Sequence, residues 1–100
     1  MKDLKNYIAG KWVDADNEGW LEVENPSTGE ILARNPLSTA AEADRAIAAA
    51  AEAYPAWSQT PVSRRVQPLY KLTERIRARE EEIARVLVAE MGKSMTDARA

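Results

Sequence analysis

Residues 38–91 contain no glycine, and alanine, glutamate and arginine dominate this stretch. Glycine weakens a helix interior more than any residue except proline, whereas Ala, Glu and Arg are strong helix formers. This part of the chain therefore favours helices. Every glycine except Gly92 lies in residues 1–37, together with the turn-like sequences and two of the three tryptophans. We therefore predict an α+β segment, with strands first and helices after them.

Residues 5–34 are predicted to form an antiparallel β-meander. The first strand, within Asn6–Val13, is aromatic and β-branched, and Trp20–Glu24 alternates between apolar and charged residues. A turn is predicted at Asn25-Pro26-Ser27-Thr28-Gly29, because proline fixes φ at about −65° and glycine accepts a positive φ. Residues 30–34 then return as the last strand.

Amphipathic helices, two or three in number, are expected over residues 39–54, 62–78 and 80–91. Thr39 stands three residues before Glu42, which is the spacing of a capping box. Pro55 is expected to end the first helix, because the residue before a proline avoids the α conformation. The stretch Arg77–Glu82 holds no apolar residue larger than alanine, so two separate helices and one continuous helix both remain open. Gly92 suits the C-terminal end.

Residues 94–100 begin one more element. Ser94 and Asp97 repeat the capping-box spacing, and only a few residues follow them. A helix that short is not stable by itself in water. We therefore expect a truncated helix here, and a chain that is a piece of a larger protein.

Residues that commonly carry chemistry are scarce. The chain has no Cys and no His, which excludes disulfides, thiolate metal sites, thiol nucleophiles and the commonest general base within it. A net charge of −2 disfavours a nucleic-acid partner. No apolar run is long enough for a membrane span, and no charged start precedes an apolar stretch as in a secretory signal. We expect no nucleic-acid or membrane partner and a cytoplasmic location.

Other candidate sites each have a simpler interpretation. The pair Arg64 and Arg65 is able to hold a phosphate, but charged residues are mostly just exposed, so a surface pair is favoured. Three tryptophans could stack on a ligand, although burial in a core or an interface is the usual role of this residue. The glycines are scattered, so neither the dinucleotide fingerprint nor the P-loop occurs. We predict no catalytic residue and no cofactor-binding residue in this chain.

Five short sequences, in order, resemble the aldehyde dehydrogenase superfamily. Tyr7–Val13 resembles its "YI-G-WV" strand, and Asn25–Glu30 resembles its "NP-TGE" turn. The later matches are to the "A-AA--AFPAW" helix, the "R---L-KL---I" helix and the "E-GK" motif, at Ala46–Trp57, Arg64–Leu72 and Glu90–Lys93. Three further segments are similar to the methylmalonate-semialdehyde dehydrogenase branch, namely Leu4–Ile8, Pro36–Thr39 and Trp57–Val62.

The resemblance implies an α/β fold for the intact protein, with residues 1–100 as the N-terminal part of its NAD(P)-binding domain. It also implies a mechanism in which a Cys thiolate attacks an aldehyde to form a thiohemiacetal. Hydride then passes to NAD or NADP, and the thioester goes to water or to CoA. In the family those residues lie downstream, so this segment alone should be an inactive scaffold. The implied partners are the remainder of its own chain, a small aldehyde substrate, and further copies in a homodimer or homotetramer.

The same resemblance implies a structural monovalent cation. Main-chain carbonyls at Val23 and Glu24 and the carboxylate of Glu90 match the family's ligand positions, whereas a solvated Glu90 on a helix surface is the simpler alternative. A different class of function also stays open, because the helices would equally suit a stand-alone protein-interaction module without catalysis.

Overall fold

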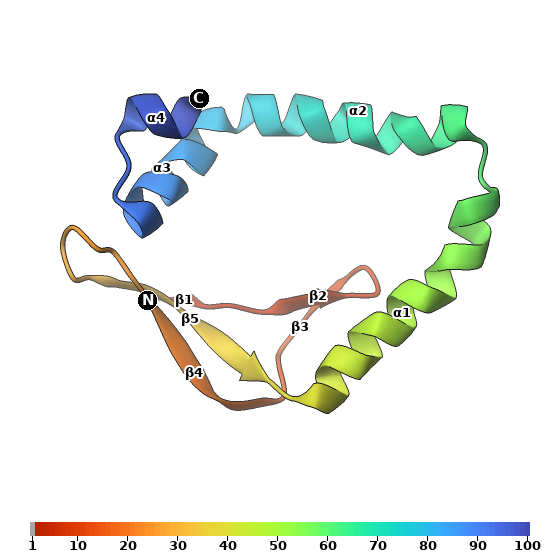
Figure 1. Cartoon of the computed structure of the whole chain (residues 1–100), viewed down its shortest axis with the longest axis horizontal. Helices are drawn as coiled ribbons and strands as arrows, with labels where there is room; N and C mark the ends of the chain where they lie inside the picture. Colours follow the sequence, from red (N-terminus) through yellow and green to blue (C-terminus); the bar gives the residue numbers. More distant parts are fainter. Residues whose placement is uncertain (1) are drawn as a thin grey trace. The chain divides into compact units, whose positions relative to one another are not determined.

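A computed structural model describes residues 2–100, which divide into two compact units. The first unit comprises the residues up to Glu24 together with Ile31–Ser58, and the second comprises Asn25–Glu30 and Gln59–Ala100. Figure 1 labels the elements along the chain. Strands precede helices throughout, which confirms the predicted α+β organisation of the segment.

A three-stranded sheet in the first unit has the order β1-β5-β4. Its strands are β1 (Lys2–Asp3), β4 (Asn17–Glu24) and β5 (Ile31–Ser38). Strand β4 pairs antiparallel with β5, whereas β1 lies parallel to β5 on the other side. Two further strands, β2 (Asn6–Ile8) and β3 (Lys11–Val13), form a separate antiparallel hairpin.

The predicted single meander over residues 5–34 is therefore wrong. Within the described residues, β3 does not pair with β4, and the third strand of the sheet comes from the start of the chain. Arg34 holds β1 in place, because its guanidinium donates two hydrogen bonds to Asp3, at 2.8 and 2.9 Å. A parallel pairing between distant segments leaves no local periodicity from which to predict it.

Strand β5 also extends four residues beyond the predicted end and includes Pro36. Proline is tolerated in a strand where its missing N–H faces an open edge. The pairs with β1 involve only Ala33 and Arg34, so at Pro36 the strand has a neighbour on one side, where Trp20 lies opposite.

Helix α1 (Ala40–Gln59) continues past Pro55, so the predicted end at residue 54 is wrong. A proline inside a helix removes one hydrogen bond and crowds the preceding turn, but the bonds on either side can still form. After it, the Ser58 hydroxyl donates to the carbonyl of Pro55 at 2.9 Å, which satisfies one polar group of the last turn.

The second unit contains α2 (Val62–Ala78), α3 (Glu80–Met91) and α4 (Met95–Arg99), close to the predicted bounds. Arg79 separates α2 from α3 with a non-helical φ of −115°, so two helices form rather than one. Its guanidinium donates to both carboxylate oxygens of Glu82, in the first turn of α3. Ser94 caps α4 as predicted, because its hydroxyl accepts the Asp97 N–H at 3.1 Å.

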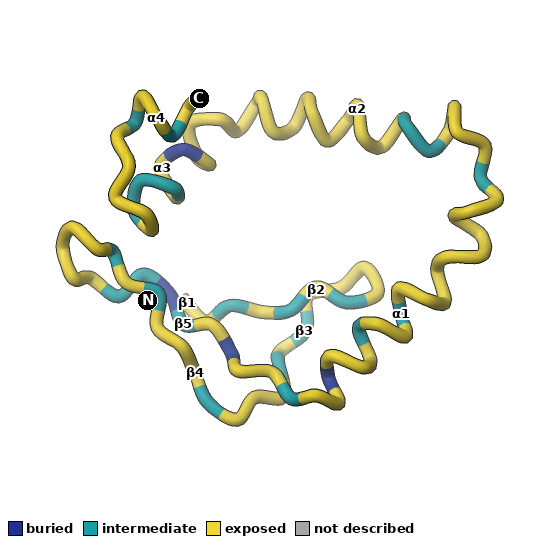
Figure 2. Tube along the Cα trace, in the orientation of Figure 1, coloured by how far each residue is buried: buried dark blue, intermediate teal, exposed yellow. Residues whose placement is uncertain are grey.

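Very little of the chain is buried (Figure 2). Among the described residues, the buried ones are Ala33, Pro36, Glu42 and Ala84. Large apolar side chains remain open instead, such as Ile47 at 67% and Leu69 at 59% exposed. The unburied apolar area indicates that these elements pack against something outside the structure. None of the described helices has the length and apolar character needed to cross a bilayer.

Candidate functional site

Val23 and Glu24, two of the predicted cation ligands, close strand β4. Val23 is half-buried opposite Ala33, whereas Glu24 is exposed opposite Ile31. The pairing register shifts between these two positions, so the ladder of hydrogen bonds is irregular there. Irregular ladder positions leave backbone oxygens available for other partners.

The turn after β4 packs against the end of α3. Asn25 organises the turn: its side-chain oxygen accepts the Ser27 N–H at 2.9 Å, and its carbonyl accepts the Gly29 N–H at 2.8 Å. A Cβ added to Gly92 would lie 3.4 Å from the Ser27 hydroxyl and 3.5 Å from Pro26 Cγ. The "NP-TGE" turn and the "E-GK" motif, far apart in sequence, therefore meet in one unit.

Glu90, the third predicted cation ligand, is exposed on the last turn of α3. Val23 and Glu24 belong to the first unit and Glu90 to the second. Across residues 2–100, no group of three or more acidic side chains is arranged to hold a metal. The cation site stays a prediction.

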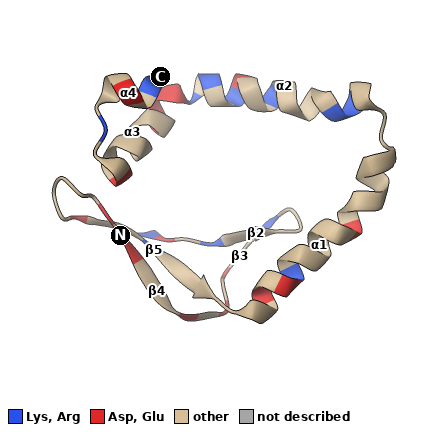
Figure 3. Cartoon of the chain, in the orientation of Figure 1, with Lys and Arg blue, Asp and Glu red and all other residues tan. Residues whose placement is uncertain are grey.

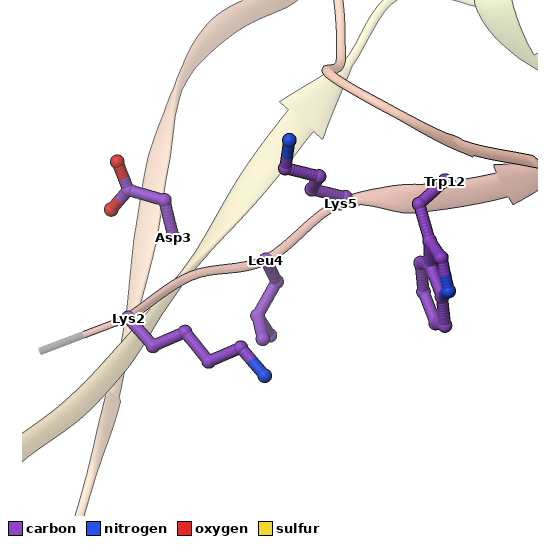
Figure 4. Close-up of a pocket in the computed structure, with 5 residues that line it drawn as sticks. All are labelled: Lys2, Asp3, Leu4, Lys5 and Trp12. Atoms are coloured by element: carbon purple, nitrogen blue, oxygen red, sulfur yellow. The ribbon is translucent and has the colours of Figure 1, made fainter.

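A surface hollow of about 450 Å³ lies beside the first strand, lined by Lys2, Asp3, Leu4, Lys5 and Trp12. Figure 4 shows Leu4 and Trp12 extending from one side of the chain, while Asp3 and Lys5 point the other way. Lys5 pairs with Asp14 at 2.9 Å, and the hydrogen bond from Arg34 lowers the pKa of Asp3. Lys5 and Asp3 are therefore paired within the chain, and the rest of the lining consists of Leu4, Trp12 and the Lys2 side chain.

The tryptophans are not core residues of this chain. Trp12 is 71% exposed and contacts Tyr7, its cross-strand partner, with ring centroids 5.0 Å apart. The Arg34 guanidinium lies 4.8 Å from the ring centre of Trp20. The exposure of Trp12 excludes burial in a core formed by the described residues, so an interface with other parts of a protein and stacking on a ligand both remain open for it.

Glu42 is a polar residue whose burial the sequence did not predict. Half of the capping box forms, since the Glu42 N–H donates to the Thr39 hydroxyl at 3.3 Å. The Thr39 N–H is already donated to the carbonyl of Asp16 at 3.1 Å, so it is not available to the Glu42 carboxylate. Glu42 is 2% exposed, and its Oε2 atom has no hydrogen-bond partner among the described residues.

Arg65 is the corresponding residue in the second unit. Its Nε atom is buried and has no hydrogen-bond partner in the described part of the chain. Buried polar groups of native proteins almost always have partners. From the sequence, Arg65 is interpreted as one of two ordinary surface residues together with Arg64. The one signal that separates them is that apolar residues follow Arg65 at helical spacing.

The elements thus define a segment with strands, a fixed turn and open helices. A model of the aldehyde dehydrogenase family matches residues 12–100. The chain belongs to the aldehyde dehydrogenase family.

Its relatives are much longer. Malonate-semialdehyde dehydrogenase 1 of Geobacillus thermodenitrificans is 46% identical over 98 residues, which are 98% of this chain and 20% of that protein. This chain therefore spans about a fifth of the length of the curated relatives it matches. The names of these relatives agree with the semialdehyde branch predicted from the sequence.

Solved structures agree on the fold. An aldehyde dehydrogenase from Bartonella henselae superimposes with a TM-score of 0.93 at 33% identity, over 98% of this chain and 21% of that one. Aldehyde dehydrogenase C from Pseudomonas syringae, solved with NAD⁺ and octanal, gives 0.92 at 38% identity over 97% of this chain and 20% of that one. The segment therefore has the fold of the matching region of these enzymes.

Proposed function

We propose that this chain forms the N-terminal fifth of an NAD(P)-dependent semialdehyde dehydrogenase and acts there as a scaffold. The observation that carries the proposal is the 46% identity to a malonate-semialdehyde dehydrogenase over nearly the whole chain. The intact protein would oxidise a small semialdehyde through a cysteine thioester to an acid or an acyl-CoA. A cytoplasmic location and assembly into homodimers or homotetramers belong to the same proposal.

The chain's own residues do not fit a nicotinamide dinucleotide. A dinucleotide pyrophosphate needs closely spaced backbone N–H groups at a glycine-rich turn. The four glycines at positions 10, 19, 29 and 92 are widely separated, and the chain offers no such turn. Cofactor and catalytic cysteine would therefore be held by the downstream part, and the role of this segment is to cover and brace that part.

A hybrid enzyme tests the proposal. This chain replaces the matching first fifth of the Geobacillus thermodenitrificans enzyme, and NAD(P)H formation from malonate semialdehyde is followed by absorbance, with and without CoA. We expect the activity of the hybrid to lie within about tenfold of the parent. A tenfold lower rate corresponds to an activation free energy that is only about 1.4 kcal/mol higher. The matched control is the parent without its first fifth. A soluble hybrid that forms no NAD(P)H, beside an active parent, would contradict the proposal.

We also propose that the intact enzyme holds Na⁺ or K⁺ at the carbonyls of Val23 and Glu24 and the carboxylate of Glu90. The irregular ladder at the end of β4 and the exposure of Glu90 support it, since hard cations prefer oxygen ligands. The melting midpoint of the hybrid should rise in K⁺ or Na⁺ relative to tetramethylammonium at equal ionic strength. The variant Glu90→Gln should remove this difference in melting midpoint. Glu52 is an exposed acid on α1, and Glu52→Gln should keep the difference. An equal response of both variants would count against the site.

A further inference from the structure

The apolar stripe of α2 contains one charged residue. Arg65, Leu69, Leu72 and Ile76 are spaced by four, three and four positions, which places them on one face of the helix. Leu69, Leu72 and Ile76 are 59%, 52% and 49% exposed. An open apolar stripe of this kind marks a contact surface.

The remaining basic residues of α2 do not share this position. Arg64, Lys71 and Arg75 each precede a residue of the stripe by one position, which places them about 100° around the helix from it, and all three are exposed, so their charged heads reach water. Figure 3 shows Lys and Arg recurring along α2. Among the basic residues of α2, Arg65 alone combines a place within the apolar stripe with a buried Nε atom that has no acceptor in residues 2–100.

The missing acceptor defines the chemistry of the partner. Leaving a charged donor without a partner in an apolar contact is costly, and a planar guanidinium matches a carboxylate with two parallel hydrogen bonds. Helix α2 carries Arg64, Arg65, Lys71, Arg75 and Arg77 against the single acid Glu74, so its charge also favours an acidic partner over a second copy of itself.

We propose that α2 docks onto the downstream part of the intact dehydrogenase chain, where an Asp or Glu set among apolar side chains binds Arg65. The inference rests on the proposed function, since that part comes from the remaining four-fifths of the enzyme. Arg65 is the anchor of the contact, and Leu69, Leu72 and Ile76 provide its apolar area.

Two variants of the hybrid enzyme test the contact. The variant Arg65→Met keeps an unbranched apolar side chain comparable to the aliphatic stem of arginine and removes the charge. The α2 amides should then exchange hydrogen at least about tenfold faster, because one partner of a buried ion pair is left alone. Arg64→Met is the matched control, and its α2 exchange should stay within about twofold of the unsubstituted hybrid.

The variant Arg65→Lys identifies the partner directly. A carbodiimide joins an amine to an adjacent carboxylate as an amide, with loss of the activated oxygen as a urea. Peptide mapping should then find residue 65 joined to an Asp or Glu downstream of this segment, and Arg64→Lys should give no such product.

Each remaining outcome overturns a distinct statement. The docking contact is overturned if hydrogen exchange is unchanged in Arg65→Met. It is also overturned if residue 65 is joined to an acid within residues 1–100 or to a second copy. In each of these cases an active hybrid still supports the proposed function. An unsubstituted hybrid that is inactive overturns the proposed function, and the docking contact with it.

Discussion

Gly92 should be the least replaceable glycine of the helical unit. It ends α3 with a φ of 71°, and its N–H donates to the carbonyl of Val88 at 3.0 Å. A non-glycine L-residue in this left-handed region costs about 1–2 kcal/mol. An added Cβ at 3.4 Å from Ser27 is in ordinary contact, so Gly92→Ala should lose this backbone term and little more.

Hydrogen exchange in the hybrid enzyme measures this cost at the place where it arises. A loss of about 1–2 kcal/mol raises the open population roughly 5–30-fold, so amides in the last turn of α3 and in the Asn25–Glu30 turn should exchange faster by that factor. Gly92→Asn should show a smaller increase, because asparagine tolerates the left-handed region better than alanine.

Gly10→Ala is the matched control for the Gly92 series. Gly10 also has a positive φ, of 77°, but an added Cβ there would have no atom within 4 Å. It should disturb the β2–β3 hairpin and leave exchange in α3 unchanged. If Gly92→Ala exchanges like the unsubstituted hybrid, the left-handed cap is not required in solution and the reasoning is refuted.

Two further predictions concern charge and solubility. Arg99 donates a hydrogen bond to Glu81 at 2.6 Å, and this hydrogen bond is the main cause of the lowered pKa of the Glu81 carboxyl. The pair therefore stabilises the folded protein at pH values above the pKa that Glu81 has in the unfolded chain. This stabilisation is lost as the pH falls through the lower pKa of the folded state. Side-chain NMR titration should find the Glu81 midpoint below the ordinary range and returned toward it in Arg99→Met, and equal midpoints in both proteins would disprove the pairing. The 100-residue chain alone should melt broadly and scatter light at rising concentration, since Ile47 and Leu69 are mostly exposed; a sharp, reversible melt of a monomer would contradict this.

Local signals predicted the helical unit well. The predicted bounds of α2 and α3 lie close to the observed ones, and Gly92 ends α3 as expected, whereas the sequence left open whether a break or a continuous helix occurs near Arg79. The Ser94 cap was likewise readable, because its partner Asp97 lies three residues away. Signals of this kind act over one or two turns, so sequence alone carries them.

The failure in the sheet involved partners distant in sequence, whereas the failure at Pro55 was local. Pro55 stops a helix only when nothing else supports the next turn, and α1 continued through it. Strand β1 pairs with β5, and Arg34 binds Asp3 across this pair. No periodicity in the sequence predicts that pairing.

The amino-acid sequence by itself determined the order of strands and helices, their caps and the family, because these depend on neighbouring residues and on short motifs. Only the tertiary structure decided that the "NP-TGE" turn rests on Gly92, and that the Oε2 atom of Glu42 and the Nε atom of Arg65 are left without hydrogen-bond partners among the described residues. Whether a polar atom is satisfied depends on which distant groups surround it in space. This is why Arg65, an ordinary surface residue in the sequence, emerges as the anchor of a contact in the fold.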